Sequence, residues 1–477
     1  MMAVLFTIVE LVRYARVRAT FPTGLRIAGI PVGGLTYETA SERLVQLYLS
    51  PIELTYDGAR IQVRPATLGF ELRVENMLAI ADQQRTSESF WIGFWKYLWN
   101  QPISGQDIPL DAKFDDERIR SYLENDLAPR YDVPSTPPMP IPGESSFSAG
   151  QTGFMIDYKK SIERIKETLG SGTNRTAVLE ILRTRPTKPG IGMLDMMLKS
   201  IIEASPFDGM LELYLKDLQS GMVLHFTYSK EFGQDIPVNI AFSSWSTIKI
   251  PVLISLFKNL AEPYDPQILA EIEKMVELSD NASTDAVTRT VINQNLGPLE
   301  VTQDIQALGI KNTFWAGYFT LGSPLLQAFT TPANERTDYV TDPDRYGQTT
   351  PEDLGLLLEE IYYCARDGGG AIPLAFNGEV TQAECQMMVQ YLGLNRIGVL
   401  IQAGVPAGVT VAHKHGWANE EQDGLVHTMG DAGIVYSAGG DYVLSIYAYH
   451  PVQILFDQTN LLFANLSSAA YNYLNLE

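Results

Sequence analysis

The sequence has 477 residues, of which 45% are hydrophobic, and its formal net charge is −21 at pH 7. Because a single hydrophobic core stops growing at about 250–300 residues, this length predicts two or three domains. The acidic balance would repel a phosphate backbone, and no stripe of lysine or arginine offsets it, so nucleic-acid binding is not expected. Only Cys364 and Cys385 occur, without a metal-ligand spacing to histidine, so neither a metal nor a cofactor is expected.

Residues 1–23 contain a short apolar run, AVLFTIVELV. The run has about half of the roughly twenty residues that a membrane-spanning helix needs. It includes Glu10, and Arg13, Arg16 and Arg18 follow it, against the order of a signal peptide. Two interpretations stay open: an amphipathic first helix, or a signal anchor whose upstream part lies outside this sequence.

Residues 24–186 carry a recurring pattern and predict a duplicated α/β domain. The segments that begin at Leu68 and Thr152 each place a Gly-Phe strand end before a helix. Each is preceded by a helical pattern with a Thr or Asp positioned as a cap, TYETASERLVQLYL and DDERIRSYLENDLA. IELTYDGARIQVRP indicates a hairpin that turns at Asp57-Gly58, and AVLEILRTRP indicates a closing strand. No catalytic cluster occurs in this half.

The segments GLRIAGIPVGGLTYETASERL and GFMIDYKKSIERI resemble a peptidoglycan-binding domain of bacterial cell-wall proteins. The resemblance covers about Gly24 to Pro186 and implies peptidoglycan as a partner. An equal alternative is a spacer that lifts the next domain away from the membrane. The Pro/Gly-rich stretch Thr184–Gly190 predicts the domain boundary, with residues 187–193 as the linker.

Residues 194–477 predict an α+β domain. MLDMMLKSIIEA indicates a helix, and MLELYLKDLQSGMVLHFTY indicates two strands joined at Gln219-Ser220-Gly221. LVHTMGDAGIVYS and DYVLSIYAYHP indicate a strand pair that turns at Gly439-Gly440. Strands from both ends of the segment, with helices between them, predict one antiparallel sheet covered by helices.

The first chemical candidate is Ser246-Thr247-Ile248-Lys249, at the start of an apolar helical run. A spacing of three places the hydroxyl and the amine on one helical face. A serine becomes a nucleophile when a neighbouring base takes its proton, and an amine whose pKa is lowered by burial can be that base. About one such pair is expected by chance, and Ser255 and Lys258 form a second one in mid-helix, which we interpret as structural.

Two further motifs follow in the chain. Ser279-Asp280-Asn281 lies between two helical patterns and alone would be a helix cap. Lys414-His415-Gly416 comes late in a strand and alone would be an exposed edge lysine with a turn glycine.

The order Ser-x-x-Lys, Ser-Asp-Asn, Lys-x-Gly is the set described for class A β-lactamases and penicillin-binding proteins. The flanks AFSSWSTIKIPVL, ELSDNASTDAV and TTPEDLGLLLEEIY also resemble the β-lactamase-related serine hydrolase family, over about Leu194 to Leu474. The resemblance implies that Ser246 attacks a carbonyl, with Lys249 as base. Ser279 would link the two lysines and pass the proton to the leaving nitrogen, and Lys414 would attract a substrate carboxylate.

The resemblance also implies substrate-binding groups. Asn281 would hold the substrate amide, and the backbone N–H groups of Ser246 and Trp417 would form the oxyanion hole. His415, Gly416 and Trp417 would belong with Asn281 to the substrate-binding residues. Asp280 is expected to fix its loop.

Two departures from the family pattern concern substrate recognition and deacylation. His415 stands where the family has Thr or Ser, so a hydroxyl that binds the substrate carboxylate is replaced by an imidazole. Class A β-lactamases need a Glu ahead of the Thr-Thr-Pro segment to activate water. Glu335 has a comparable position before Thr349, but NERTDY lacks the Glu-x-x-Leu-Asn form.

We therefore expect a cofactor-free, extracytoplasmic serine hydrolase, membrane-anchored or secreted at the cell surface. It would form an acyl-enzyme on Ser246 with β-lactams or D-Ala-D-Ala-like peptidoglycan peptides. The alternative is a non-catalytic cell-wall-binding protein that retains the hydrolase scaffold, which His415 and the Glu335 pattern favour.

Overall fold

The computed structural model describes residues 2–101, 105–231, 233–395 and 397–476. The chain forms two compact units. The N-terminal unit runs to Pro137 and includes Gly150–Thr187, and the C-terminal unit comprises Pro138–Ala149 and the residues from Lys188 onward. After Thr187 the chain passes again to the C-terminal unit, and the helix that follows begins at Ile191.

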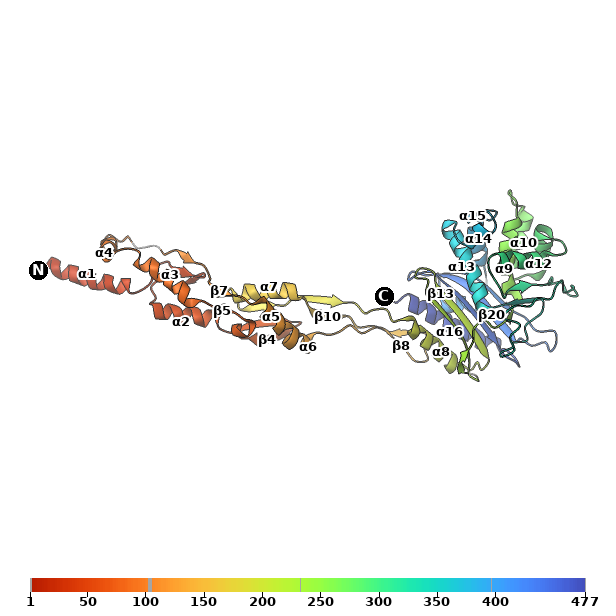
Figure 1. Cartoon of the computed structure of the whole chain (residues 1–477), viewed down its shortest axis with the longest axis horizontal. Helices are drawn as coiled ribbons and strands as arrows, with labels where there is room; N and C mark the ends of the chain where they lie inside the picture. The colour runs from red at the N-terminus through yellow and green to blue at the C-terminus, as the bar shows by residue number, and fades with distance from the viewer. Residues whose placement is uncertain (1, 102–104, 232, 396, 477) are drawn as a thin grey trace. The chain divides into compact units, whose positions relative to one another are not determined.

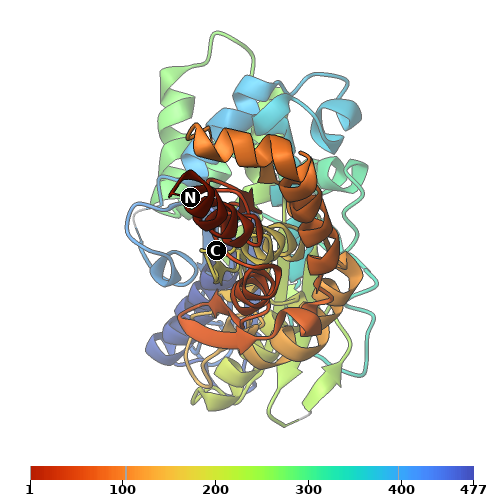
Figure 2. The ribbon, with the colours of Figure 1, turned by 90° about the vertical axis from the view of Figure 1, so that its left-hand side faces the viewer.

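The N-terminal unit begins with the long helix α1 (Met2–Arg18), seen in dark red in Figure 2. Short strands and helices follow: β1 (Arg26–Ile27), β2 (Ile30–Pro31), α2 (Tyr37–Tyr48), β3 (Ile52–Tyr56), β4 (Ala59–Val63), η1 (Pro65–Leu68), β5 (Glu71–Leu72), α3 (Val74–Thr86), α4 (Phe90–Leu98), β6 (Asp107–Ile108) and β7 (Ala112–Lys113). The rest are α5 (Asp116–Tyr122), η2 (Leu123–Leu127), α6 (Ala128–Tyr131), β10 (Gly153–Ile156), α7 (Tyr158–Leu169), β11 (Thr176–Val178) and β12 (Ile181–Thr184).

Local sequence signals in this unit are confirmed. Thr36 accepts a hydrogen bond from the N–H of Thr39 at the start of α2, and Asp115 does the same for Arg118 at the start of α5. The β3–β4 hairpin turns at Asp57 and Gly58, both with positive φ. None of the described helices is both long and apolar enough to cross a bilayer.

The expected closing strand is instead two strands in two sheets. β11 pairs in parallel with β3, whereas β12 pairs antiparallel with β10. The chain changes sheet at Leu179 and Glu180, where the N–H of Leu179 donates to Thr55 and the carbonyl of Glu180 accepts from Asp157. In the two halves of the expected duplication, β5 pairs antiparallel with β7 and β10 pairs antiparallel with β12. The duplication stays a prediction.

Residues Pro138–Ala149 were expected in the first domain and lie instead with the C-terminal unit. They form a hairpin of β8 (Met139–Pro140) and β9 (Phe147–Ser148). The hairpin packs on the last helix, α16 (Phe456–Leu474), where Asn472 Nδ2 donates to the carbonyl of Ser145 at 2.6 Å. The Phe147 and Tyr473 rings are also in contact.

The main sheet of the C-terminal unit is six-stranded and antiparallel, as predicted, in the order β15-β14-β13-β21-β20-β19. It combines strands from both ends of the segment: β13 (Met210–Asp217), β14 (Val223–Ser229), β15 (Gly233–Ile236), β19 (Thr410–Trp417), β20 (Thr428–Tyr436) and β21 (Tyr442–Tyr449). The predicted turns at Gly221 and Gly440 are present, both with positive φ. β19 is an edge strand.

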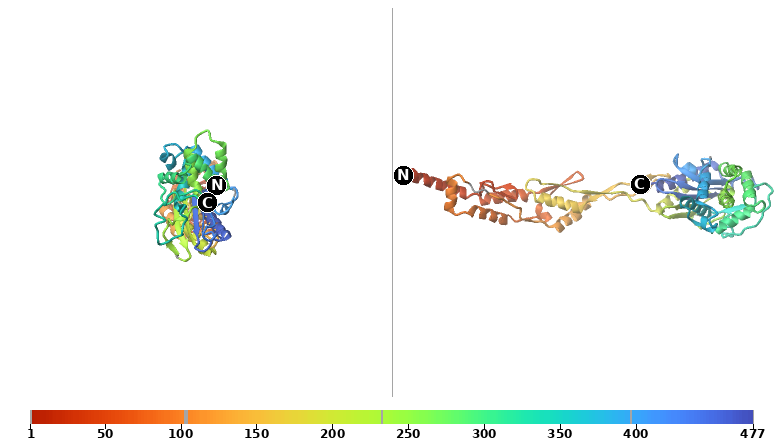
Figure 3. Two further views of the ribbon diagram at one scale, coloured as in Figure 1. Left: turned by 90° about the vertical axis from the view of Figure 1, so that its right-hand side faces the viewer. Right: turned by 90° about the horizontal axis from the view of Figure 1, so that it is seen from above.

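Helices cover both faces of this sheet (Figures 1 and 3). On one face, α8 (Ile191–Ala204) and α16 enclose a core with Leu213, Leu444 and Ile446. On the other face, a second core contains Ala412, Val443 and the apolar sides of α9 (Lys249–Asn259), α10 (Pro266–Glu277), α12 (Gly297–Ala307), α13 (Pro351–Asp367) and α15 (Gln382–Leu392).

Shorter elements connect this second layer and surround the motifs. They are β16 (Phe242–Ser243), η3 (Trp245–Ile248), α11 (Asn281–Val287), η4 (Thr288–Ile292), β17 (Phe314–Trp315), β18 (Gly347–Thr349), α14 (Ala371–Ala375) and η5 (Gln402–Gly404). β18 pairs with both β16 and β17, which fixes the chain immediately before η3.

The two cysteines form a disulfide between α13 and α15, a pairing that the sequence did not predict. Both sulfurs belong to the buried core on the α9 side of the sheet. The bond closes a loop with a sequence separation of 21 residues.

We predict that removing this disulfide lowers the free energy of unfolding of the C-terminal unit by about 3 kcal/mol, because the open chain regains loop entropy when unfolded. Thermal unfolding of the wild type with and without reductant measures the loss. The double variant Cys364→Ala, Cys385→Ala should melt near the reduced wild type and be insensitive to reductant. A melting temperature that reductant leaves unchanged in the wild type would contradict the prediction.

Candidate functional site

Ser246 lies in the first turn of a helix that starts at the end of the small sheet. The turn η3 runs from Trp245 to Ile248, and α9 continues from Lys249. Trp245 has a φ of 44°, in the left-handed region, so the chain bends sharply as it enters the turn. The bend leaves Ser246 half-buried, whereas Thr247 and Ile248 point into the core.

The amine of Lys249 is surrounded by oxygen atoms from two segments. Its Nζ lies 2.9 Å from Ser246 Oγ, 2.8 Å from the carbonyl oxygen of Ser279, 3.3 Å from Ser279 Oγ and 2.7 Å from Asn281 Oδ1. The side chain of Lys249 is fully buried. The first two predicted motifs therefore meet at one nitrogen atom.

The loop at 279–281 is held in place by its own backbone conformation. Ser279 has a φ of 59°, which turns both its carbonyl and its hydroxyl toward Lys249. Asp280 caps α11 by accepting a hydrogen bond of 2.7 Å from the N–H of Ser283. Asp280 thus fixes the loop, as expected, while its two neighbours contact the amine.

The electrostatic environment favours a neutral Lys249. Burial lowers the pKa of Lys249 well below its usual value, and the charge of the nearby Lys414 lowers it further. Asp280 and Asp285 act in the opposite direction but do not cancel these effects. A lysine whose pKa is lowered in this way is neutral, and so able to accept a proton, in a larger fraction of molecules at a given pH than an exposed lysine.

Lys414 is the second buried lysine of the site. It lies on the edge strand β19, and its Nζ donates to the carbonyl of His415 at 3.1 Å. Burial lowers its pKa to about 8, although the carboxylate of Asp431 on the neighbouring strand raises it in part. Lys414 thus carries its charge through most of the neutral range.

Gly416 lets β19 approach the turn that carries Ser246. A Cβ at this position would lie 2.8 Å from the backbone nitrogen of Ser246, 3.0 Å from that of Thr247 and 3.0 Å from the carbonyl oxygen of Ser244. All three are backbone atoms, which cannot rotate away. The third motif therefore meets the first through a contact that only glycine permits.

His415 and Trp417 lie on the opposite face of β19 from Lys414, since side chains alternate along a strand. Their rings stack at a centroid distance of 4.6 Å, and His413 makes an edge contact with His415. Burial, followed by the charge of Lys414, lowers the pKa of His415 to about 3, so its imidazole is neutral. Among the described residues its buried Nε2 has no hydrogen-bond partner.

Glu335 is not joined to this cluster. Its side chain is exposed, and its backbone N–H donates to Thr331 at 3.1 Å. Within the described part of the chain its carboxylate makes no hydrogen bond or ion pair. The second Ser-x-x-Lys pair has structural surroundings: Ser255 is fully buried, and Lys258 Nζ lies 2.6 Å from Asp304.

Sequence reasoning missed two residues beside Lys249. The Phe319 ring lies under its amine, with Nζ 4.9 Å from the ring centroid. Asp285 holds this loop, because its carboxylate accepts hydrogen bonds of 2.9 Å and 2.8 Å from the N–H groups of Phe319 and Thr320. Phe319 lies in an irregular loop without a recognisable motif, so no sequence signal identified it.

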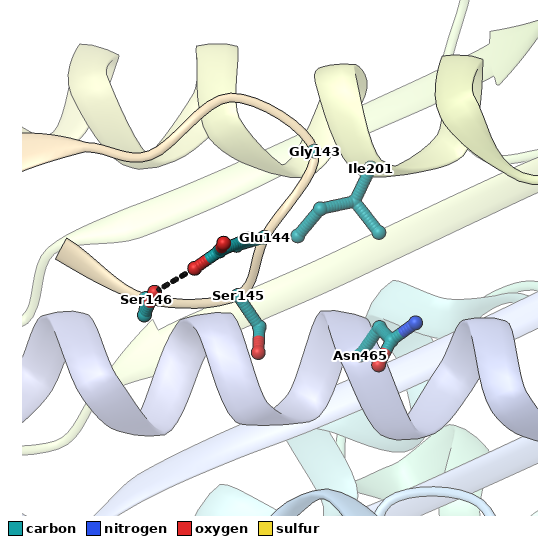
Figure 4. A pocket seen from close by; sticks show the side chains of 6 residues that line it. All are labelled: Gly143, Glu144, Ser145, Ser146, Ile201 and Asn465. Atoms are coloured by element: carbon teal, nitrogen blue, oxygen red, sulfur yellow. Dashed lines mark hydrogen bonds between the residues drawn. The ribbon is translucent and has the colours of Figure 1, made fainter.

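Two surface hollows of the C-terminal unit lie elsewhere. One is formed by Gly143–Ser146, Ile201 and Asn465, between the β8–β9 hairpin, α8 and α16 (Figure 4). The other lies between α13, α15 and the sheet, beside Tyr362 and Arg366. Neither shares a residue with the cluster around Lys249.

Residues 262–474 match the family model described as "Beta-lactamase enzyme family". The match includes the second and third motifs and begins after Ser246 and Lys249. It supports a relationship of the C-terminal unit to β-lactamase-related serine hydrolases. A comparison with curated proteins found no match.

Solved structures with a similar arrangement include PBP-A, with 19% identity and a TM-score of 0.41 over 60% of this chain and 97% of that one. The TLA-1 extended-spectrum β-lactamase has 15% identity and a TM-score of 0.43, with 60% and 99% covered. A β-lactamase from Desulfarculus baarsii DSM 2075 has 16% identity and a TM-score of 0.43, with 61% and 100% covered.

We predict that Gly416→Ala disrupts the site while the fold survives. The added methyl group would push β19, which carries Trp417, away from the Ser246 turn, and displacement of the oxyanion-hole donors expected at Ser246 and Trp417 would slow acyl transfer by about a hundredfold. The measurement is the rate of covalent labelling by penicillin. Gly192→Ala, where a Cβ meets nothing within 4 Å, is the matched control and should label normally. Equal rates for the two variants would contradict the close-approach argument.

Proposed function

We propose that the protein is a serine hydrolase that forms an acyl-enzyme on Ser246. Its substrates would be β-lactams or D-Ala-D-Ala-like peptidoglycan peptides at the cell surface. The observation that carries this proposal is the 2.9 Å contact between the Lys249 amine and the Ser246 hydroxyl inside a ring of acceptors.

The hydrogen bonds of Lys249 accommodate either protonation state, because an ammonium group would donate its third N–H to Ser246 Oγ, and it is the lowered pKa that favours the neutral amine as a base. The carbonyl of Ser279 and Oδ1 of Asn281 can only accept, so the amine must donate to both. A neutral amine has two N–H bonds and one lone pair. Donation to these two oxygens leaves the lone pair for the Ser246 hydroxyl.

In the proposed reaction, Ser246 Oγ bonds to the substrate carbonyl carbon as its proton passes to Lys249 Nζ. The carbon–nitrogen bond then breaks. Ser279 Oγ, 3.3 Å from Nζ, is placed to relay the proton to the leaving nitrogen. The backbone N–H groups of Ser246 and Trp417 would hold the developing oxyanion.

The surrounding groups would bind the substrate. Asn281 is exposed and would contact the substrate amide, while Lys414 would provide positive potential for a carboxylate. His415 would alter this recognition through a neutral imidazole in place of a hydroxyl. Because Glu335 has no contact with the cluster, we propose slow deacylation, typical of a peptidase or slow esterase rather than of a resistance enzyme.

An extracytoplasmic location agrees with the Cys364–Cys385 disulfide, since such bonds persist mainly in oxidising compartments. The N-terminal unit would then bind peptidoglycan or act as a spacer. The rival function, a non-catalytic wall-binding protein, is favoured by the imidazole at 415.

We predict that fluorescent penicillin labels the wild type and not Ser246→Ala. Ser255→Ala is the matched control, because Ser255 belongs to the buried second Ser-x-x-Lys pair, and it should label like the wild type. Intact mass should show one added penicillin that persists through repeated sampling. Label on neither the wild type nor the Ser255→Ala variant would favour the scaffold function.

The rate of acylation by penicillin should depend on pH in two ways. It should rise with pH as Lys249 loses its proton, through a pKa well below the usual value for lysine of 10.5. It should fall above about pH 8, where Lys414 loses the charge that attracts the carboxylate. Stopped-flow acylation rates across pH 5–10 test this, and Lys414→Met should be slower and lack the falling limb. A wild-type rate that climbs steadily up to pH 10 would contradict the lowered pKa.

A further inference from the structure

The N-terminal unit carries an exposed apolar surface on α1 and α4, which we name the α1–α4 patch. It consists of Val4, Leu5, Phe6, Ile8, Val9 and Val12 of α1, together with Trp91, Ile92, Trp95 and Trp99 at α4. Three of the six tryptophans of the chain are in this patch. They are 63%, 61% and 73% exposed, which is unusual for such large apolar side chains.

α4 is fixed against the second half of α1 through aromatic contacts. The Tyr14 ring lies 5.2 Å from Phe90, 5.5 Å from Phe94 and 5.4 Å from Tyr97. A Cβ at Gly93 would collide with the Tyr14 hydroxyl, so the helices are in direct contact there. The opposite side of α4 is therefore packed against α1, and this packing fixes the helix that carries the exposed tryptophans.

Two side-chain contacts show that α4 lies antiparallel to the second half of α1. Phe90, at the start of α4, lies under the Arg18 guanidinium, and Tyr97, near its end, donates to Glu10 at 3.3 Å. Trp91, Trp95 and Trp99 follow at intervals of four residues and share one side of α4. The tryptophans thus lie alongside residues 10–18 of α1, and the first turns of α1 extend beyond them.

The first turns of α1 are apolar and exposed all round. Residues 4–9 are consecutive and all exposed, and five of these six are apolar. Six residues cover more than one full turn of an α-helix, so a partner protein with a flat surface would cover only part of them. The hydrocarbon of a bilayer would surround these turns on every side. A lipid bilayer is therefore favoured over a second copy of the chain as the partner of this segment.

The charges of α1 also suit a lipid surface. Arg13, Arg16 and Arg18 lie in its second half, at the level of α4, whereas the whole chain carries −21. The single acid of α1, Glu10, is paired with Arg13 at 2.7 Å. Arginines and tryptophans at one level beside an apolar tip match the headgroup region of a bilayer next to its hydrocarbon.

We propose that the α1–α4 patch inserts into one leaflet of an anionic lipid bilayer. The apolar turns from Val4 to Val12 would enter the hydrocarbon, and the α4 tryptophans would lie at the headgroups. The nine helical residues from Val4 to Val12 would span about 13 Å of this hydrocarbon.

Flotation of the full chain with phosphatidylglycerol–phosphatidylcholine vesicles tests the proposal. The wild type should bind these vesicles and bind pure phosphatidylcholine more weakly. The triple variant Trp91→Ser, Trp95→Ser, Trp99→Ser should bind about tenfold more weakly or worse, because three large apolar side chains no longer enter the interface. Lipids brominated near the headgroup should quench part of the wild-type tryptophan fluorescence and none in the triple variant.

The matched control is Leu321→Ser, Leu374→Ser, which removes two exposed apolar side chains from the C-terminal unit and should bind like the wild type. Circular dichroism checks that each variant is folded, and Phe6→Asp provides an independent variant on α1 that should also lose binding. Equal binding by the triple variant and the wild type would overturn the proposal. A lipid-free dimer that the triple variant dissociates, without vesicle binding by the wild type, would overturn it in favour of a second copy.

Discussion

The active arrangement depends on the burial of one primary amine. Lys249 is fully buried, and an amine removed from water must regain its hydrogen bonds within the protein. The oxygens that supply them come from positions 246, 279 and 281, so the burial is tolerable only while the helix start and the 279–281 loop converge. The same burial lowers the pKa of the amine, so the burial that fixes the geometry also supports the base role that we propose for Lys249.

A second buried amine explains why the sheet edge matters. The charge of Lys414 lowers the pKa of Lys249, because two positive charges close together in the protein interior repel each other. The buried carboxylate of Asp431, itself held by His413 Nδ1 at 2.9 Å, raises the pKa of Lys414. Burial and the neighbouring charges therefore favour a neutral Lys249 and a charged Lys414, the states that the proposed proton abstraction and carboxylate attraction would need.

Features that depend on neighbouring residues could be predicted from the sequence, whereas features that depend on residues far apart in the chain could not. Caps at Thr36 and Asp115 and the hairpin at Asp57 were predictable, because each is decided within a few residues. The three motifs were recognised from their order in the chain. The distances between them in space could not be predicted in this way. The Cys364–Cys385 bond and the transfer of residues 138–149 to the second unit depend on tertiary contacts and left no local signal.

The departure at position 415 has a limited structural effect for a geometric reason. In a strand, the residue between Lys414 and Gly416 points to the face opposite Lys414. His415 accordingly stacks on Trp417 and contacts His413, whereas Lys414 and the backbone of Gly416 reach toward the Ser246 turn. The larger side chain can thus be accommodated without moving Ser246 relative to Lys249. The substitution at 415 and the contact between Ser246 and Lys249 are structurally separate, because His415 lies on the face of β19 opposite to the one that meets the Ser246 turn.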